Sequence, residues 1–323
     1  MLLPKSRTLK HVLMALGAVC AAGIGPSASV AHAADKYPAR PVEFIVPWGP
    51  GGGADALARQ AGKMLEQSLN ASFPVINVPG ATGRTGLNKM LAAPSDGYTI
   101  SIMTGDTFGL LTSPKPNWSL DQLVPVAIMI RQPSGFMVSE SGSIKSWADL
   151  EREAKSRPLK VAVTGFGSPD DLTVNYFRKR GLQLVSVPFA KPGERYSAIL
   201  GGHADVLYEQ PGDVRSFIDG KQMRPVILFG EKRHPYFKDV PVSKELGFDI
   251  TMPQFRMVTV KAGTDAAQID VLSRELEKAA KTPEFRKYLE DQIAEPDSFV
   301  SAKDAQAFLK GELAAMKEHA GVK

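Results

Sequence analysis

The stretch Pro41-Val-Glu-Phe-Ile-Val-Pro-Trp-Gly-Pro-Gly-Gly-Gly53 decides the fold at the start of this chain. Its apolar residues Val42–Val46 predict a short buried strand, and the glycines after them predict a tight turn. A helix is expected directly afterwards, over Ala54–Leu69. Backbone N–H groups at a helix N-terminus are unpaired, the helix dipole is positive there, and glycine permits close approach. The stretch therefore predicts an anion site built from backbone atoms.

Two other interpretations of the Gly49–Asp55 turn stay open. The first is a dinucleotide-binding turn, which Gly49-Pro-Gly-Gly-Gly-Ala54 also fits, although the next strand ends in Val75–Pro79 without the acid that would hold a ribose. The second is a purely structural glycine turn. In the anion-binding interpretation, Asp55 is expected at the N-cap or first position of the helix, where it holds the turn.

Residues 1–33 have the pattern of a secretory signal peptide. A basic start precedes an apolar run over 12–24, and Ala31-His-Ala33 is a cleavage site, so we expect cleavage near Ala33/Ala34 and a periplasmic protein. A membrane anchor would need about 20 apolar residues, and the apolar run over 12–24 is too short for that. Cys20 raises a lipoprotein alternative, but no large aliphatic residue stands three positions before it.

Composition excludes several classes of protein. The formal net charge is +5, and the leader supplies three basic residues and no acidic one, which leaves only +2 on the remaining chain. We therefore expect no nucleic-acid partner. Cys20 is the single cysteine, so the exported chain has no disulfide, and its stability must come from a hydrophobic core.

Predicted strands and helices alternate over residues 40–104 and again over 158–229. This order is typical of parallel sheets with helices on both faces. We expect an α/β protein of two lobes, each a mostly parallel sheet flanked by helices, with the ligand cleft between them. The expected bounds are 34–130 plus 252–323 for lobe 1 and 131–251 for lobe 2, with crossover strands near 125–138 and 250–260.

Two further glycine-rich turns follow predicted strands. Val78–Gly86 contains Arg84, which either forks onto a ligand carboxylate or is an ordinary solvated side chain. Thr164–Asp171 leads into a helix for which Ser168 is a natural N-cap. The Ser168 hydroxyl either only caps that helix or also faces the cleft opposite Gly51–Gly53.

Patterns for bond chemistry are missing from the sequence. No G-x-S-x-G elbow occurs, and His203, His234 and His319 lack metal-ligand spacing. We therefore expect no enzyme, no metal and no cofactor. Tyr208-Glu209-Gln210 ends a strand at the expected cleft, where Glu209 either contacts a polar group of the ligand or forms a local salt bridge.

Several motifs occur in a fixed order over nearly the whole chain after the leader. They are Tyr37-Pro-Ala-Arg-Pro-Val42, Ile45–Asp55, Asn77-Val-Pro-Gly-Ala-Thr-Gly83, Pro94-Ser-Asp-Gly-Tyr-Thr-Ile100, Val187-Pro-Phe189 with Leu200-Gly-Gly-His-Ala-Asp205, and Asp239-Val-Pro-Val-Ser-Lys-Glu245. Together they resemble the periplasmic solute-binding proteins of tripartite tricarboxylate transporters, the TctC or Bug family.

The resemblance implies a type II periplasmic-binding-protein-like fold that closes on a small carboxylate, partly through ordered waters. It also implies a monomer whose partners are a large and a small membrane permease subunit. Trp48 and Phe166 are expected to line the pocket and to report closure. The residues expected to contact the ligand are Trp48, Pro50, Gly51, Gly52, Gly53, Ala54, Asp55, Thr82, Gly83, Arg84, Thr104, Thr107, Gly165, Phe166, Gly167, Ser168, Phe189, Tyr208, Glu209 and Gln210.

The chain departs from the family pattern at the pocket wall. Ala190–Arg195 replaces the usual Lys-Gly-Gly-x-Pro-Ala, Tyr208-Glu209-Gln210 replaces Phe-Asp-Asn, and Arg84 replaces a common Asn. The ligands of the family therefore do not identify the ligand of this protein. The additional arginines indicate a second ligand carboxylate, whereas Glu209 indicates an amine or hydroxyl.

We expect a periplasmic solute-binding protein that captures a small carboxylate by lobe closure and delivers it to a tripartite tricarboxylate-type membrane transporter. The alternative is an extracytoplasmic ligand sensor that presents a carboxylate to a two-component receptor. Nothing in the predicted pocket separates these two functions.

Overall fold

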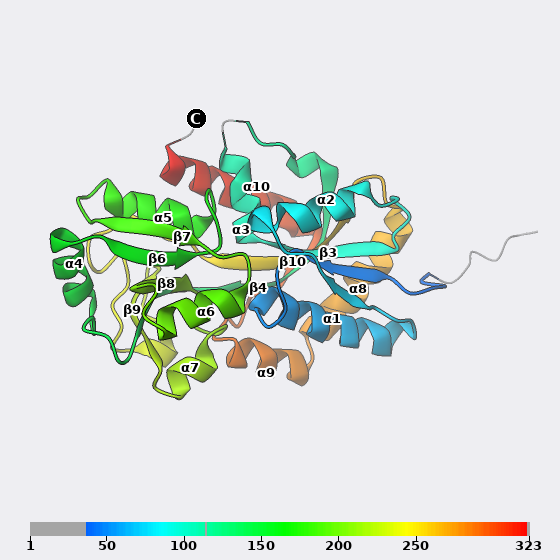
Figure 1. Cartoon of the computed structure of the whole chain (residues 1–323). Helices are drawn as coiled ribbons and strands as arrows, with labels where there is room; N and C mark the ends of the chain where they lie inside the picture. Colours follow the sequence, from blue (N-terminus) through cyan, green and yellow to red (C-terminus); the bar gives the residue numbers. More distant parts are fainter. Residues whose placement is uncertain (1–36, 114, 322–323) are drawn as a thin grey trace, which may run out of the picture. The chain divides into compact units, whose positions relative to one another are not determined.

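The computed structural model describes residues 37–113 and 115–321. The predicted leader and its cleavage site lie outside these residues. Within the described part the chain forms two β-sheets with helices packed on their faces (Figure 1). None of the helices in this part is long and apolar enough to cross a membrane.

The first sheet has six strands in the order β11-β4-β10-β3-β1-β2. Strand β1 pairs in parallel with β2 and β3, whereas β10 pairs antiparallel with β3 and β4, and β11 pairs antiparallel with β4. The bounds are β1 Glu43–Val46, β2 Val75–Asn77, β3 Thr99–Thr104, β4 Leu123–Gln132, β10 Gln254–Lys261 and β11 Val300–Ser301.

The second sheet has five strands in the order β7-β6-β8-β5-β9. Strand β6 pairs in parallel with β7 and β8, and β5 pairs antiparallel with β8 and β9. Both sheets are therefore mixed rather than mostly parallel, because the strands at the crossovers enter each sheet in the opposite direction. The bounds are β5 Ser134–Ser139, β6 Leu159–Val163, β7 Leu184–Pro188, β8 Val206–Glu209 and β9 Met223–Phe229.

The helices include α1, which begins within one residue of the helix predicted over Ala54–Leu69. Their bounds are α1 Gly53–Leu69, α2 Arg84–Ala92, α3 Gly105–Gly109, α4 Trp147–Ser156, α5 Pro169–Arg178, α6 Pro192–Leu200, α7 Arg215–Asp219, α8 Ala266–Ala280, α9 Pro283–Asp291 and α10 Ala302–Ala320. Short 3₁₀ helices cover Ala81–Gly83, Leu110–Thr112, Leu120–Gln122 and Pro235–Phe237.

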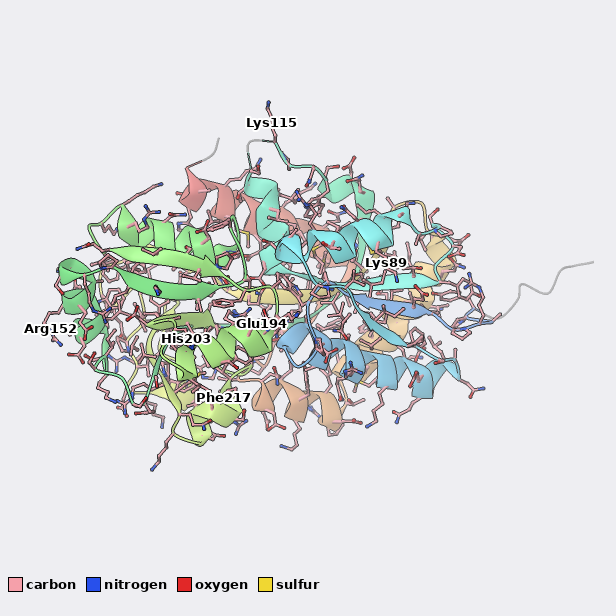
Figure 2. The ribbon with its side chains drawn as sticks, viewed as in Figure 1. Lys89, Lys115, Arg152, Glu194, His203 and Phe217 are labelled. Atoms are coloured by element: carbon pink, nitrogen blue, oxygen red, sulfur yellow. The ribbon has the colours of Figure 1, made fainter. Side chains whose placement is uncertain are left out.

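Side chains along β1 point alternately to the two faces of the sheet, and both faces are covered, which explains why its apolar run is continuous. Phe44 and Val46 pack in the same core cluster as α1 residues such as Leu57, while Ile45 packs on the other side with Leu87 of α2. A strand that is covered on both faces has no polar side. Many of the charged side chains lie on the outside of the protein, as Figure 2 shows for Arg152 and Lys115.

The chain passes from the first sheet to the second between β4 and β5, and it returns along β10. The C-terminal helix α10 contacts β4 of the first sheet and α5, which lies against β7 of the second (Figure 1). One continuous core cluster includes Leu309 of α10, Phe255 of β10 and Phe177 of α5. The lobe boundaries expected from the sequence stay a prediction.

Candidate ligand-binding site

A small cavity of about 30 Å³ lies where the elements that follow β1 and β3 meet those that follow β6 and β8. A space of this size holds about one water molecule. A ligand of several heavy atoms can therefore enter only when the walls move apart. The lining residues are Trp48, Gly52, Gly53, Ala54, Thr104, Asp106, Thr164, Asp170, Pro192, Arg195, Tyr196, Glu209, Gln210, Asp213 and Arg256.

Helix α1 points its N-terminus at this cavity. Gly52 is the N-cap residue, and no side chain caps the helix there. The first intrahelical bond runs from the N–H of Ala56 to the carbonyl of Gly52, at 3.0 Å. The backbone of Gly53 and Ala54 therefore presents the positive end of the helix dipole to the cavity.

Asp55 holds this turn, but it does so from the third position of the helix rather than from the N-cap or first position. Its Oδ2 accepts the N–H of Gly51 at 3.1 Å, and its Oδ1 accepts Nδ2 of Asn77 at 3.0 Å. Burial raises the pKa of Asp55, but hydrogen bonds from Arg59, Gly51 and Asn77 outweigh it and hold that pKa below its usual value. The carboxylate is therefore committed to the loop, and Asp55 does not line the cavity.

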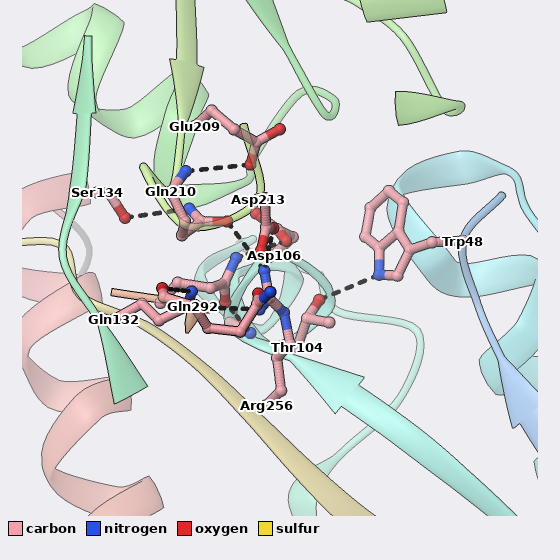
Figure 3. Close-up of polar contacts among 12 residues, drawn as sticks. Trp48, Thr104, Asp106, Gln132, Ser134, Glu209, Gln210, Asp213, Arg256 and Gln292 are labelled. Carbon is pink, nitrogen blue, oxygen red and sulfur yellow. Dashed lines mark hydrogen bonds and ion pairs between the residues drawn. The ribbon is translucent and has the colours of Figure 1, made fainter. Parts of the chain in front are cut away.

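One wall of the cavity is held by Trp48 and Thr104. The ring Nε1 of Trp48 donates to Oγ1 of Thr104 at 3.2 Å (Figure 3). The same oxygen also accepts the N–H of Thr107 at 3.4 Å, which caps α3. The Thr104 hydroxyl therefore connects the indole ring to the first turn of α3.

Two buried ion pairs form the opposite wall. Nη2 of Arg195 lies 2.5 Å from Oε2 of Glu209, and Nη2 of Arg256 pairs with Oδ2 of Asp213. Arg256 also donates to Oε1 of Gln210 at 3.2 Å (Figure 3). Arg256 belongs to β10 of the first sheet, whereas Gln210 and Asp213 follow β8 of the second, so these bonds join the two sides. Burial raises the pKa of Asp213 to about 6, in spite of Arg256.

Asp106 and Asp170 meet at the same cavity from α3 and α5. Thr164 bridges them, since its hydroxyl lies 2.9 Å from Oδ2 of Asp170 and 3.4 Å from Oδ1 of Asp106. Nε2 of Gln254 donates to Oδ2 of Asp106 at 2.7 Å. Burial raises the pKa of both carboxyls. The charge of Asp106 raises the pKa of Asp170 further, whereas a hydrogen bond with Asp170 lowers the pKa of Asp106.

Seven of the residues predicted to contact a ligand line the cavity: Trp48, Gly52, Gly53, Ala54, Thr104, Glu209 and Gln210. Of the two alternatives for Glu209, the salt bridge is present, although the residue also lines the cavity. Predicted residues that do not line the cavity include Pro50, Gly51, Asp55, Thr82, Gly83, Thr107, Gly165, Gly167, Ser168, Phe189 and Tyr208.

Three predicted side chains have other surroundings than expected. Arg84 is exposed at the start of α2. The Phe166 side chain is 63% exposed and does not line the cavity. Ser168 is fully buried, and its Oγ donates to the carbonyl of Gly165 at 2.7 Å while accepting from Asp171, so this hydroxyl is used by the N-cap.

The turn that contains Ser168 nevertheless packs tightly against the other side. A Cβ at Gly165 would collide with Oγ1 of Thr82, and a Cβ at Gly52 would lie 2.6 Å from Cγ of Pro192. Glycine at these positions therefore leaves room for the side chains of Thr82 and Pro192.

Sequence reasoning missed most of the charged residues of the cavity. The lining residues that were not among the predicted ligand contacts are Asp106, Thr164, Asp170, Pro192, Arg195, Tyr196, Asp213 and Arg256. Of these, Pro192 and Arg195 belong to the stretch Ala190–Arg195, which was expected at the pocket wall. Arg256 carried a usable signal, because it interrupts an otherwise apolar strand pattern. Asp106 comes two residues after the end of β3, but Asp170 was indistinguishable from the acid that commonly opens a helix. No group of three or more His, Cys, Asp or Glu is placed to hold a metal ion within the described ranges.

Solved periplasmic binding proteins share this fold. The periplasmic binding protein BugD matches with a TM-score of 0.80 and 22% identity, over 87% of this chain and 97% of that chain. An R. palustris protein, Rpa4515, whose structure contains adipate, matches with a TM-score of 0.82 and 23% identity, over 88% and 97%. These likenesses show that the chain has the fold of periplasmic binding proteins.

The family follows from the sequence comparison. The model of the tripartite tricarboxylate transporter family receptor, TctC, matches residues 57–319, so the chain belongs to that family. Protein BugT of Bordetella pertussis is 30% identical over 279 residues, which cover 84% of this chain and 85% of BugT. The resemblance predicted from the ordered motifs is confirmed. The family and its structural neighbours are periplasmic solute-binding proteins rather than enzymes.

Proposed function

We propose that this protein captures a small carboxylate between its two lobes in the periplasm and delivers it to a membrane permease with a large and a small subunit. The observation that carries the proposal is the N-terminus of α1, which has no side-chain cap and faces the cavity. Its backbone N–H groups and its dipole favour a carboxylate. Adipate in the related R. palustris structure supports the same ligand class.

Lobe closure strengthens such binding. When the walls close around a ligand, water is removed and charge-assisted hydrogen bonds act in a lower dielectric. Domain closure about hinge segments is a common way of enclosing ligands. The segments between β4 and β5 and before β10 connect the two sheets and are the proposed hinges.

A thermal-shift screen of the full chain tests the proposal, with mono-, di- and tricarboxylates, amino acids and uncharged alcohols. A ligand at about 100 times its Kd adds about 2.7 kcal/mol of stability. We expect at least one carboxylate to raise the melting temperature and no alcohol to do so. A screen in which no carboxylate raises it would contradict the proposal.

A pair of glycine variants locates the binding site. Gly52→Val places side-chain atoms against Pro192 and is expected to weaken carboxylate binding by at least tenfold. Gly193→Val is the matched control, because a Cβ at that position of α6 meets nothing within 4 Å. Equal affinities in the two variants would place the carboxylate elsewhere. Delivery is tested separately, by loss of labelled-ligand uptake in cells that lack the protein.

A further inference from the structure

Two carboxyl groups meet across the boundary between the two sheets. Asp106 belongs to α3, which directly follows β3 of the first sheet, and Asp170 belongs to α5, which follows β6 of the second. The two carboxyl groups are hydrogen-bonded to each other. Asp106 is only 6% exposed and Asp170 only 1%, so little water reaches this contact. The contact therefore joins the two sides of the cavity inside the protein.

The bond between these carboxyl groups requires a proton. Ionised carboxylates only accept hydrogen bonds, so two of them are joined only when one carries a proton. Oδ2 of Asp170 accepts the N–H and the hydroxyl of Thr164, at 2.7 and 2.9 Å, whereas its buried Oδ1 has no other donor among the described residues. Asp106 accepts Nε2 of Gln254 at 2.7 Å. The proton therefore belongs on Oδ1 of Asp170, and Asp106 is its acceptor.

The other charged groups around the pair do not replace this proton. Arg195 of α6 lowers the pKa of both carboxyls, but it is paired with Glu209 of β8 at 2.5 Å, and burial outweighs its effect. Arg256 of β10 is paired with Asp213. The other titratable groups near the pair are Tyr196, Tyr208 and Asp171. Burial raises the pKa of both tyrosines, so they stay uncharged.

Moving the walls of the cavity apart removes the need for the proton. When Asp106 and Asp170 separate and enter water, each regains the ordinary aspartate pKa of about 4, and both are ionised at neutral pH. When they meet again without water, two negative charges in one buried site repel each other, so one carboxyl is protonated. Closing of the walls therefore takes up a proton.

We propose that closure of the lobes binds one proton between Oδ1 of Asp170 and the carboxylate of Asp106, which makes the closed form sensitive to pH. This inference rests on the lobe closure of the proposed function but not on the identity of the ligand. Because the closed form holds one proton more than the open form, a rise in pH favours opening. The ratio of closed to open form falls by up to about tenfold per pH unit between the open-form pKa of about 4 and the raised pKa of the closed form.

Small-angle X-ray scattering of the full chain without added ligand, from pH 5 to 9, tests the inference. We expect the radius of gyration of the wild type to rise with pH as the open form gains. In Asp170→Asn the amide keeps the size of the carboxyl group and supplies a permanent N–H donor to Asp106, so this variant is expected to stay compact. Asp213, with a pKa raised to about 6, titrates in both proteins, so the difference between them belongs to the Asp106–Asp170 pair.

Infrared spectroscopy detects the proton itself. At pH 6 the carbonyl stretch of protonated carboxyl groups is expected to be weaker in Asp170→Asn than in the wild type, by one group. Asp106→Asn serves if Asp170→Asn does not fold, because its amide donates to Asp170 in the same contact. The control is Asp270→Asn, an exposed position on α8 that is expected to keep both the pH dependence and the carbonyl band.

Three results would overturn the inference. They are a constant radius of gyration of the wild type across the pH range, an equal rise in the wild type and in Asp170→Asn, and an equal carbonyl band in these two proteins. None of them bears on carboxylate capture, because no ligand takes part in either measurement. The proposed function fails separately, when the thermal-shift screen finds no carboxylate that binds.

Discussion

Arg195 and Glu209 form an ion pair of 2.5 Å between α6 and the end of β8, and each side chain exposes no more than 4% of its surface. Removing one partner leaves a buried charge without compensation, which costs about 3–5 kcal/mol. We therefore expect Glu209→Gln to lower the free energy of unfolding by that amount in urea denaturation. Asp270→Asn breaks an exposed pair and is expected to cost at most about 1 kcal/mol. A loss below 1 kcal/mol in Glu209→Gln would show that the Arg195 charge finds another partner.

The second prediction concerns the pH dependence of stability. The folded pKa of Asp170 is raised by burial and by Asp106, so the folded state holds a proton more tightly than the unfolded state does. Asp170 therefore makes its full contribution to the free energy of unfolding below the unfolded pKa of about 4, and this contribution is lost as the pH rises. Asp213, with a pKa raised to about 6, adds a loss between about pH 4 and 6. We expect Asp170→Asn to raise the melting temperature at pH 8 and to change it little at pH 4.

An acid with the opposite shift is the control for that measurement. Hydrogen bonds from Arg152 and Ser146 lower the pKa of Asp149 to about 2. Its contribution is present above about pH 4 and is lost only as the pH falls towards 2. Asp149→Asn should therefore lower the melting temperature at pH 8, in the direction opposite to Asp170→Asn. If both variants shift it in the same direction, the pKa of Asp170 is not raised in the folded protein.

Ser168→Ala is predicted to act on stability rather than on contacts with the ligand. Its Oγ accepts the N–H of Asp171 at 3.4 Å and donates to Gly165, so it serves as the N-cap of α5. Loss of such a cap costs about 1 kcal/mol. Thr282→Ala removes the equivalent cap of α9 and should cost about the same. A loss of affinity of more than tenfold in Ser168→Ala, without a change in stability, would show instead that the hydroxyl reaches the ligand.

Trp48 and Phe166 are predicted to differ as reporters of binding. Trp48 lines the cavity and donates to Thr104, so opening and closing of the walls should change its fluorescence. Phe166 is largely exposed, and Phe166→Ala is expected to change ligand affinity by less than about threefold. The measurement is the ligand-induced emission change in the wild type and in Trp48→Phe. An unchanged signal in Trp48→Phe would assign it to the core residues Trp118 or Trp147.

Local patterns in the sequence determined the elements of this fold and the position of the anion turn. The apolar run at Val42–Val46, the glycines after it and the Ser168 cap are short-range signals, since each depends on the conformational preferences of a few neighbouring residues. The ordered motifs likewise identified the family. The mixture of parallel and antiparallel pairing in the two sheets was harder to predict from the sequence, because strand pairing depends on residues that are far apart in the chain.

The tertiary structure alone decided the chemistry of the cavity. Asp106, Asp170, Asp213 and Arg256 are far apart in the sequence, and each has an ordinary local role in a helix, loop or strand. Their charges acquire consequences only where packing removes water and brings them within a few ångströms of one another, since desolvation and Coulomb interactions depend on distance in space and not along the chain. The sequence thus predicted an anion turn at the start of α1, whereas the carboxylates opposite it emerged only from the packing of the two sheets.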